Sequence, residues 1–154
     1  MRSLGQSVLS AACLAFVMFG AGAAQAKDYI KGTRAQERGY SEAVITEGGK
    51  IMWLAGQTAT VDDAGKSLAG NFDGQVRQIF RNLDRTLNKA GGKLSDIVQM
   101  TVFITDVRDG DRLVKLRHDI LHDNFPGSAL ITITALAVPE AKIEIQGYAV
   151  IGGR

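Results

Sequence analysis

Alternation of apolar and polar residues is the clearest pattern near the end of this chain. Residues 130–134 (LITIT) and 142–148 (KIEIQGY) each alternate with a period of two, and Pro139 interrupts the sequence between them. A period of two is typical of strands that bury one face, and a proline between two such stretches marks a turn. The sequence therefore predicts that two strands close the fold.

Three further strands and two helices are predicted earlier in the chain. The strands cover residues 40–46, 50–55 and 97–105. The first two are expected to form a hairpin across Gly48-Gly49. Apolar residues at steps of three and four predict one helix from Val76 to Leu87 and a shorter one from about Arg112 to Asp123. The resulting order β-β-α-β-α-β-β predicts an α+β fold with both helices on one face of a mixed sheet.

The N-terminus has the layout of a secretory signal peptide. Arg2 precedes an apolar run at residues 8–20, and small residues lead to an Ala-x-Ala site that ends at Ala26. This run has 13 residues, fewer than the roughly 18 that a membrane-spanning helix needs. Lipidation at Cys13 is the weaker alternative, because only a short apolar stretch precedes that residue. We therefore expect residues 1–26 to be removed and the protein to be exported, to the periplasm.

Cleavage after Ala26 limits the chemistry of the mature chain. It leaves 154 − 26 = 128 residues, which is enough for one domain with a core of its own. Cys13 is the only cysteine, so the mature chain is expected to contain no disulfide, thiolate nucleophile or cysteine-bound metal. Its net charge becomes 17 − 16 = +1, which gives no electrostatic reason to expect nucleic acid or a membrane surface as a partner. Residues 27–38 are polar and lack periodicity, which predicts a flexible arm before a domain at residues 39–154.

Two features are candidates for chemistry on the residues alone. Glu144 lies within a predicted strand and shares a face with Gln146, so a solvated or interface-facing acid is the simplest interpretation. His118 and His122 are four residues apart, a spacing that can bring two imidazoles to one metal. No third ligand is evident, and the pair falls outside the apolar stripe of its helix. We therefore predict a solvated position for the histidines and no metal site.

A series of short motifs extends over nearly the whole predicted mature chain. They are Gly39-Tyr40-Ser41-x-Ala43-Val44, Leu54-Ala55-Gly56-Gln57, Gln75…Asn82-Leu83…Leu87…Ala90-Gly91, Asp96-Ile97-Val98, Thr101-Val102-Phe103-Ile104-Thr105-Asp106, Phe125-Pro126 and Ile143-Glu144-Ile145. Each motif is weak alone, but in this order and spacing they resemble the Rid family (YjgF-like, reactive intermediate deaminases). The resemblance implies a chorismate-mutase-like α+β fold, a homotrimer with ligand sites between subunits, and hydrolysis of reactive imines or enamines without a cofactor.

The same resemblance supplies the candidate site. Glu144 corresponds to the family's active-site acid, which is thought to act on the attacking water. The substrate-binding candidates are Tyr40, Ala55, Gly56, Gln57, Ser128 and Leu130. Other roles stay open: Glu144 as an interface hydrogen-bond acceptor, Tyr40 as a packing residue, and Gly56 as the end of a strand.

The chain departs from the family pattern at the residue expected to bind a carboxylate. Two residues after Pro126 the family normally has an arginine, whereas this chain has Ser128. Replacing a charge-assisted guanidinium by one neutral hydroxyl should lose roughly 2 kcal/mol of carboxylate binding. The sequence thus predicts an imine or enamine deaminase whose substrate lacks, or does not rely on, the carboxylate that this arginine normally binds. The alternative is a non-catalytic ligand-binding or protective trimer.

Two further questions concern the charged residues. Ribonuclease activity, which is sometimes attached to the family, is disfavoured by the net charge of +1 and by the lack of a clear histidine acid–base pair. The sequence leaves open whether Arg112, Lys115 or Arg117 reaches the ligand site from the second predicted helix. Ala55 is a smaller departure, since the family often has serine there.

Overall fold

The computed structural model of this chain describes residues 27–153. The predicted signal peptide, residues 1–26, lies outside the described residues. In chain order the elements are β1 (Asp28–Ile30), α1 (Thr33–Glu37), β2 (Ala43–Ile45), β3 (Lys50–Gln57), α2 (Phe72–Asn88), β4 (Ile97–Ile104), α3 (Gly110–Leu121), β5 (Gly127–Thr132) and β6 (Ile143–Ile151), with 3-10 turns at Leu94–Asp96 and Val107–Asp109.

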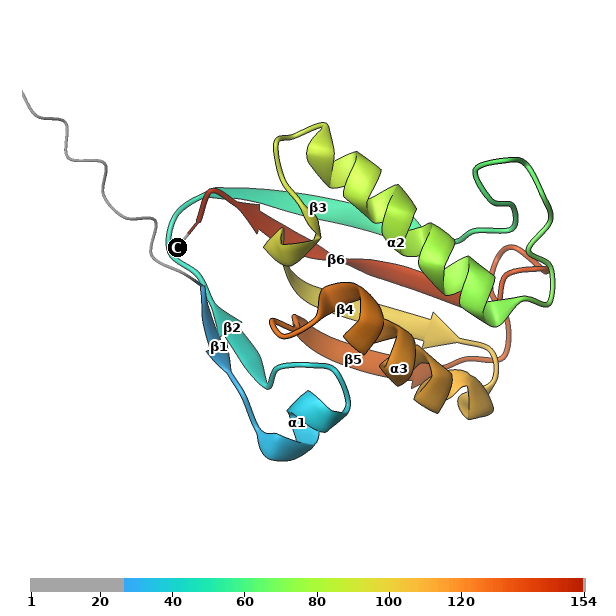
Figure 1. Cartoon of the computed structure of the whole chain (residues 1–154), viewed down its shortest axis with the longest axis horizontal. Coiled ribbons are helices and arrows are strands. Elements are labelled where there is room, and N and C mark those ends of the chain that lie inside the picture. Colours follow the sequence, from blue (N-terminus) through green and yellow to red (C-terminus); the bar gives the residue numbers. More distant parts are fainter. Residues whose placement is uncertain (1–26, 154) are drawn as a thin grey trace, which may run out of the picture.

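The main sheet has four strands in the order β3-β6-β4-β5. Strands β4 and β5 are parallel, and β6 is antiparallel to both β3 and β4. The parallel pair needs a crossover, which α3 supplies. Helices α2 and α3 both lie over one face of this sheet (Figure 1). The predicted α+β class, with a mixed sheet and its two long helices on one face, is therefore confirmed.

Helix α2 begins where its sequence provides a cap. The side-chain oxygen of Asn71 accepts a hydrogen bond from the backbone N–H of Gly74 at 3.0 Å, and Asp73 adds a negative charge to the first turn. The predicted stripe faces the sheet, and its members are buried: Val76, Ile79, Phe80, Leu83 and Leu87. Full burial of each such side chain stabilises the fold by roughly 1.5–3 kcal/mol.

Alternate residues of the central strands supply the other side of the core. In β4 these are Met100, Val102 and Ile104, and in β6 they are Ile143 and Ile145. Residues between them, Glu144 among them, therefore point to the opposite face of the sheet. The pattern that predicted the strands thus also determines that the acid faces away from α2 and α3.

The predicted arm at residues 27–38 instead contains regular secondary structure. It forms β1 and α1, and β1 pairs antiparallel with β2. The predicted hairpin between residues 40–46 and 50–55 was also wrong, because β2 pairs with β1 whereas β3 pairs with β6. At the start of the described chain, the ammonium of Lys27 lies 2.7 Å from the carboxylate of Asp96, which fastens β1 to the main domain.

Within residues 27–153, no helix combines the length and the apolar character that crossing a membrane requires.

Candidate functional site

Three of the predicted substrate-binding residues meet in one cavity of about 210 Å³. Its lining residues are Arg38, Tyr40, Val114, Arg117, Ser128 and Leu130. Leu130 is the register partner of the buried Val102, so Leu130 and Ser128 face the helix side of β5. The cavity therefore lies between the edge strand β5 and helix α3.

Tyr40 reaches this cavity because the next residue anchors the chain to β5. Ser41 is 1% exposed, and its hydroxyl donates to the carbonyl of Phe125 at 2.6 Å. Its backbone N–H donates to the carbonyl of Pro126 at 3.0 Å, and it forms a parallel bridge with Gly127. These bonds satisfy a buried hydroxyl and bring Tyr40 and Ser128 to the same cavity.

Arg117 is the buried cation of the cavity. It follows Leu113 by four residues and Val114 by three on α3, so it lies on the helix face that packs inward. Only 2% of Arg117 is exposed. The stem packs against Gly39, whose φ of +69° favours glycine and where an added Cβ would lie 3.4 Å from the Cβ of Arg117.

The guanidinium of Arg117 is only partly satisfied by the protein. Its Nη1 donates to the carbonyl of Gly39 at 3.3 Å, while its Nε has no hydrogen-bond partner among the described residues. The hydroxyl of Ser128 is likewise buried without such a partner in residues 27–153. Burial, and secondarily the charge of Arg38, lowers the pKa of Arg117 to about 10. The group therefore still carries its charge at neutral pH.

The other basic residues of this region are engaged elsewhere or exposed. Arg112 contacts Asp73 and Asp109, each at 2.8 Å, and Lys115 is exposed. Arg38, which was not predicted, lines the cavity and contacts Asp111 at 2.6 Å. Among the three basic residues left open by the sequence, Arg117 is the one that lines the cavity.

The remaining candidates form a second group where β3 and β6 pair. The register shifts between Leu54 and Gln57, so β3 carries one extra residue at Ala55-Gly56, a β-bulge. The carboxylate of Glu144 lies directly over Gly56, where an added Cβ would be 2.9 Å from the carboxyl carbon. A glycine at this position leaves room for the acid. Gly56 is exposed, and Glu144 and Gln57 are partly exposed.

The two groups are separate within one chain, because neither Glu144 nor residues 55–57 line the cavity that holds Tyr40 and Ser128. Glu144 shares the outer face of the sheet with exposed apolar side chains. Trp53 and Tyr148 are register partners there, 73% and 42% exposed, with ring centroids 4.9 Å apart. Ile51 and Ile131 are exposed as well. We call Ile51, Trp53, Ile131 and Tyr148 the outer apolar patch.

The histidines occupy different environments. Nε2 of His118 lies 3.2 Å from the carbonyl oxygen of Glu37, and its ring packs edge-on against Phe125 with centroids 4.7 Å apart. His122 follows the last turn of α3 with a φ of +61° and is exposed. The predicted solvated position therefore holds for His122 but not for His118, which is partly buried by α1 and Phe125.

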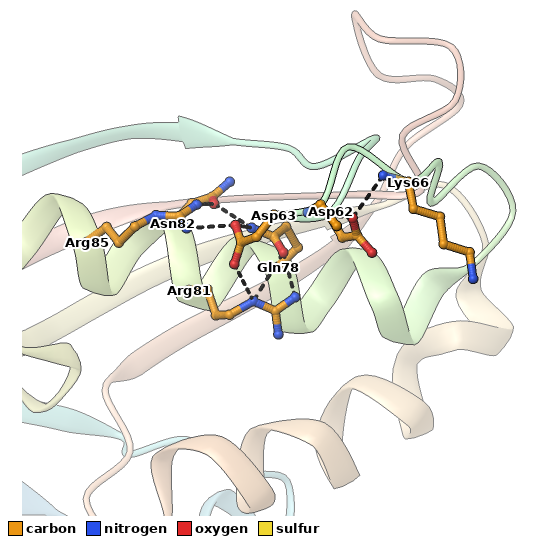
Figure 2. A network of polar contacts seen from close by, with 8 residues as sticks. Asp62, Asp63, Lys66, Gln78, Arg81, Asn82 and Arg85 are labelled. Atoms are coloured by element: carbon orange, nitrogen blue, oxygen red, sulfur yellow. Dashed lines mark hydrogen bonds and ion pairs between the residues drawn. The ribbon is translucent and has the colours of Figure 1, made fainter.

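A larger hollow of about 430 Å³ lies along α2, and its arginines are paired. Arg85 and Arg81 lie 2.7 and 3.4 Å from the two carboxylate oxygens of Asp63. Gln78 joins them through its amide, as Figure 2 shows. Arg77 contacts Asp119 at 3.4 Å. Each cation therefore already has a carboxylate, and we regard this polar network as a surface feature.

Comparison with known proteins places these observations in a family. The family model described as "Endoribonuclease L-PSP" matches residues 32–151. A RutC family protein of Aquifex aeolicus is 35% identical over 112 residues, which cover 72% of this chain and 87% of that protein. A protein of Dermatophagoides farinae named 2-iminobutanoate/2-iminopropanoate deaminase is 25% identical over 112 residues, 73% of this chain and 85% of that protein.

A solved structure supports the fold independently. The Rid family protein YyfB of Yersinia pestis superposes with a TM-score of 0.71 at 22% identity, covering 81% of this chain and 98% of that one. The fold that the sequence motifs implied is therefore confirmed. From the family-model match over residues 32–151 and the Aquifex relative, we conclude that the chain belongs to the Rid (YjgF-like) family.

Proposed function

We propose that this protein is an exported deaminase that hydrolyses reactive imines or enamines to carbonyl compounds and ammonia. The observation that carries the proposal is the carboxylate of Glu144 lying directly over the Gly56 backbone at a bulge of β3. Bulges are over-represented next to active sites, where they redirect side chains. The deaminase name of the Dermatophagoides relative supports the same reaction class.

The chemistry requires one acid–base group and one water molecule. Glu144, as a carboxylate, accepts a proton from water while the water oxygen bonds to the imine carbon and the imine nitrogen takes up a proton from solvent. The proton held by Glu144 then passes to the nitrogen of the carbinolamine. As the C–N bond breaks, ammonia leaves, the carbinolamine hydroxyl returns one proton to solvent and the carbonyl forms. Water is the only co-reactant, so the step needs neither a metal nor an oxidant.

A complete site would require a second copy of the chain. One chain carries the acid group and the cavity group on separate surfaces, and the outer apolar patch lies on the same sheet face as Glu144. Exposed apolar side chains on one face of a sheet are typical of a protein–protein interface. We therefore propose a homotrimer in which Glu144 of one subunit faces the cavity of the next. Light scattering should give three times the subunit mass, and a monodisperse monomer would contradict this assembly.

Turnover of 2-aminoacrylate, followed as ammonia release, tests the proposed reaction. Glu144→Gln should slow turnover at least roughly 100-fold, because general acid–base catalysis contributes about that much or more. Glu47→Gln is the matched control, since Glu47 is an exposed acid in the turn before β3. Turnover that is equally fast in Glu144→Gln and wild type would refute the role of Glu144.

The alternative is a non-catalytic protein that binds a small molecule in the same cavity. Ser128 favours it, because the position where the family normally carries an arginine is uncharged. Ligand binding without turnover of any imine by the wild-type protein would support this second function over the first.

A further inference from the structure

The cavity between β5 and α3 contains a charge that the protein leaves without a counter-ion. Arg117 is 2% exposed, and no carboxylate lies within 4.0 Å of its guanidinium in the part of the chain from residue 27 to 153. Asp111, an acid on the same helix, is paired with Arg38 at 2.6 Å. An ionised group removed from water is strongly destabilising unless it is paired.

Unsatisfied hydrogen-bond donors accompany that charge. Nε of Arg117 and the hydroxyl of Ser128 are both buried without a partner among the described residues, although native proteins satisfy most buried polar atoms. Gln75 in the core of this protein follows the usual rule, since its amide donates to two carbonyls at 3.0 and 2.9 Å and accepts an N–H at 2.8 Å. Among the described residues a third buried side-chain atom, Oδ1 of Asp73, also lacks a hydrogen bond, but it lies 2.8 Å from the guanidinium of Arg112, so the two unsatisfied atoms without a charged partner both belong to the cavity.

We infer that Arg117 determines specificity for an anionic ligand, and that it binds the carboxylate of a small organic acid together with the hydroxyl of Ser128. This inference rests on the proposed function, because it names the substrate class of the same site. The guanidinium comes from α3, whereas the family resemblance led us to expect it at position 128 of β5. The substrate therefore keeps the carboxylate that the sequence analysis expected it not to rely on.

The size and lining of the cavity fit a small acid. A guanidinium presents N–H donors in a planar fork that matches a carboxylate, and a deprotonated acid supplies the missing negative charge. Leu130 and Val114 offer apolar contacts for a short alkyl or vinyl group. At roughly 30 Å³ per water molecule, a cavity of about 210 Å³ accommodates a ligand of six to eight non-hydrogen atoms.

Calorimetric titration with pyruvate and with its neutral amide, pyruvamide, tests the inference without any turnover. The wild-type protein should bind pyruvate at least roughly tenfold more tightly than pyruvamide, since hydrogen bonds to charged groups are the strong ones. Arg117→Met should abolish that preference, and Arg117→Lys should restore part of it by keeping the charge. Arg77→Met, which removes an exposed arginine of α2 paired with Asp119, is the control and should behave as wild type.

Equal affinities for pyruvate and pyruvamide in the wild-type protein, or no measurable binding of either, would overturn the inference. An unchanged preference in Arg117→Met would do the same. The wild-type comparison decides the question even if a variant fails to fold. A carboxylate preference without imine turnover would leave Arg117 in its role and refute the proposed reaction, whereas turnover without that preference would refute the role of Arg117 alone.

Discussion

The arginines of α2 and the arginine of α3 are the same residue type in opposite environments. The side chains of Arg81 and Arg85 are 50% and 56% exposed and share Asp63 in the network of Figure 2. Arg117 is 2% exposed and has only a backbone carbonyl as a partner within residues 27–153. Exposed ion pairs contribute about 0–1 kcal/mol, whereas an unpaired buried charge is strongly destabilising. Charge density alone therefore does not identify a ligand site, whereas a buried charge without a partner does.

The largest expected effect is on the free energy of unfolding. Removing the buried charge of Arg117 should raise it, whereas breaking the α2 network around Asp63 should lower it slightly. Arg117→Met should raise the free energy of unfolding by about 1–3 kcal/mol, because it replaces a buried charge with an apolar chain of similar length. Urea denaturation at neutral pH measures this change. A loss of stability of similar size would show that the charged group is satisfied in the folded protein, which would remove the contrast with α2.

The stability gained by Arg117→Met should depend on pH, because the pKa of Arg117 is lowered to about 10 by burial and by the charge of Arg38. Below this pH both folded and unfolded chains hold the proton, so the destabilisation is fully present. Above it the folded chain releases the proton before the unfolded chain does, and the wild-type protein recovers stability. The advantage of Arg117→Met over wild type should therefore be constant from pH 7 to 9 and shrink above pH 10. An advantage that grows with pH would contradict the assigned cause.

A smaller effect is expected from Ser128→Ala. The change removes one neutral hydrogen bond to the bound carboxylate and should weaken pyruvate binding by roughly two- to tenfold. Stability should stay the same or rise slightly, because the hydroxyl is buried without a partner among the described residues. Calorimetry with pyruvate and urea denaturation measure the two quantities. A loss of pyruvate affinity as large as that caused by Arg117→Met would show that Ser128 has the main role in binding the carboxylate.

The smallest effect is expected from Asp63→Asn. This change removes the negative charge that Arg81 and Arg85 share, yet both arginines remain solvated. The free energy of unfolding should fall only slightly, because these ion pairs are exposed, and by less still at high salt. Pyruvate affinity should not change. A measurable change in affinity would show that the α2 network is coupled to the ligand site.

The sequence predicted the elements of the main sheet well because its patterns are local. The alternation in residues 142–148 corresponds to β6, and the stripe from Val76 to Leu87 lies within α2. Pairing between strands is not local, and the hairpin prediction failed for that reason: β2 has three residues and pairs with β1, a segment without clear periodicity. The prediction of a loose arm failed with it.

The candidate site was predicted only in part. The family motifs identified Tyr40, Ser128 and Leu130, which the structure brings to one cavity. Arg117 stayed an open question, although its position four residues after Leu113 places it on the apolar stripe of α3. A charged residue on an apolar stripe is the signal that would have selected it. Its missing partner is a tertiary property that no helical pattern contains.

A crystal structure of the protein soaked with pyruvate tests the role of Arg117 most directly. A carboxylate oxygen should lie about 2.7–3.1 Å from the guanidinium of Arg117, and the Ser128 hydroxyl should donate to the same carboxylate. Pyruvate bound against Ser128 with no contact to Arg117, or bound only beside Arg81 and Arg85, would contradict it.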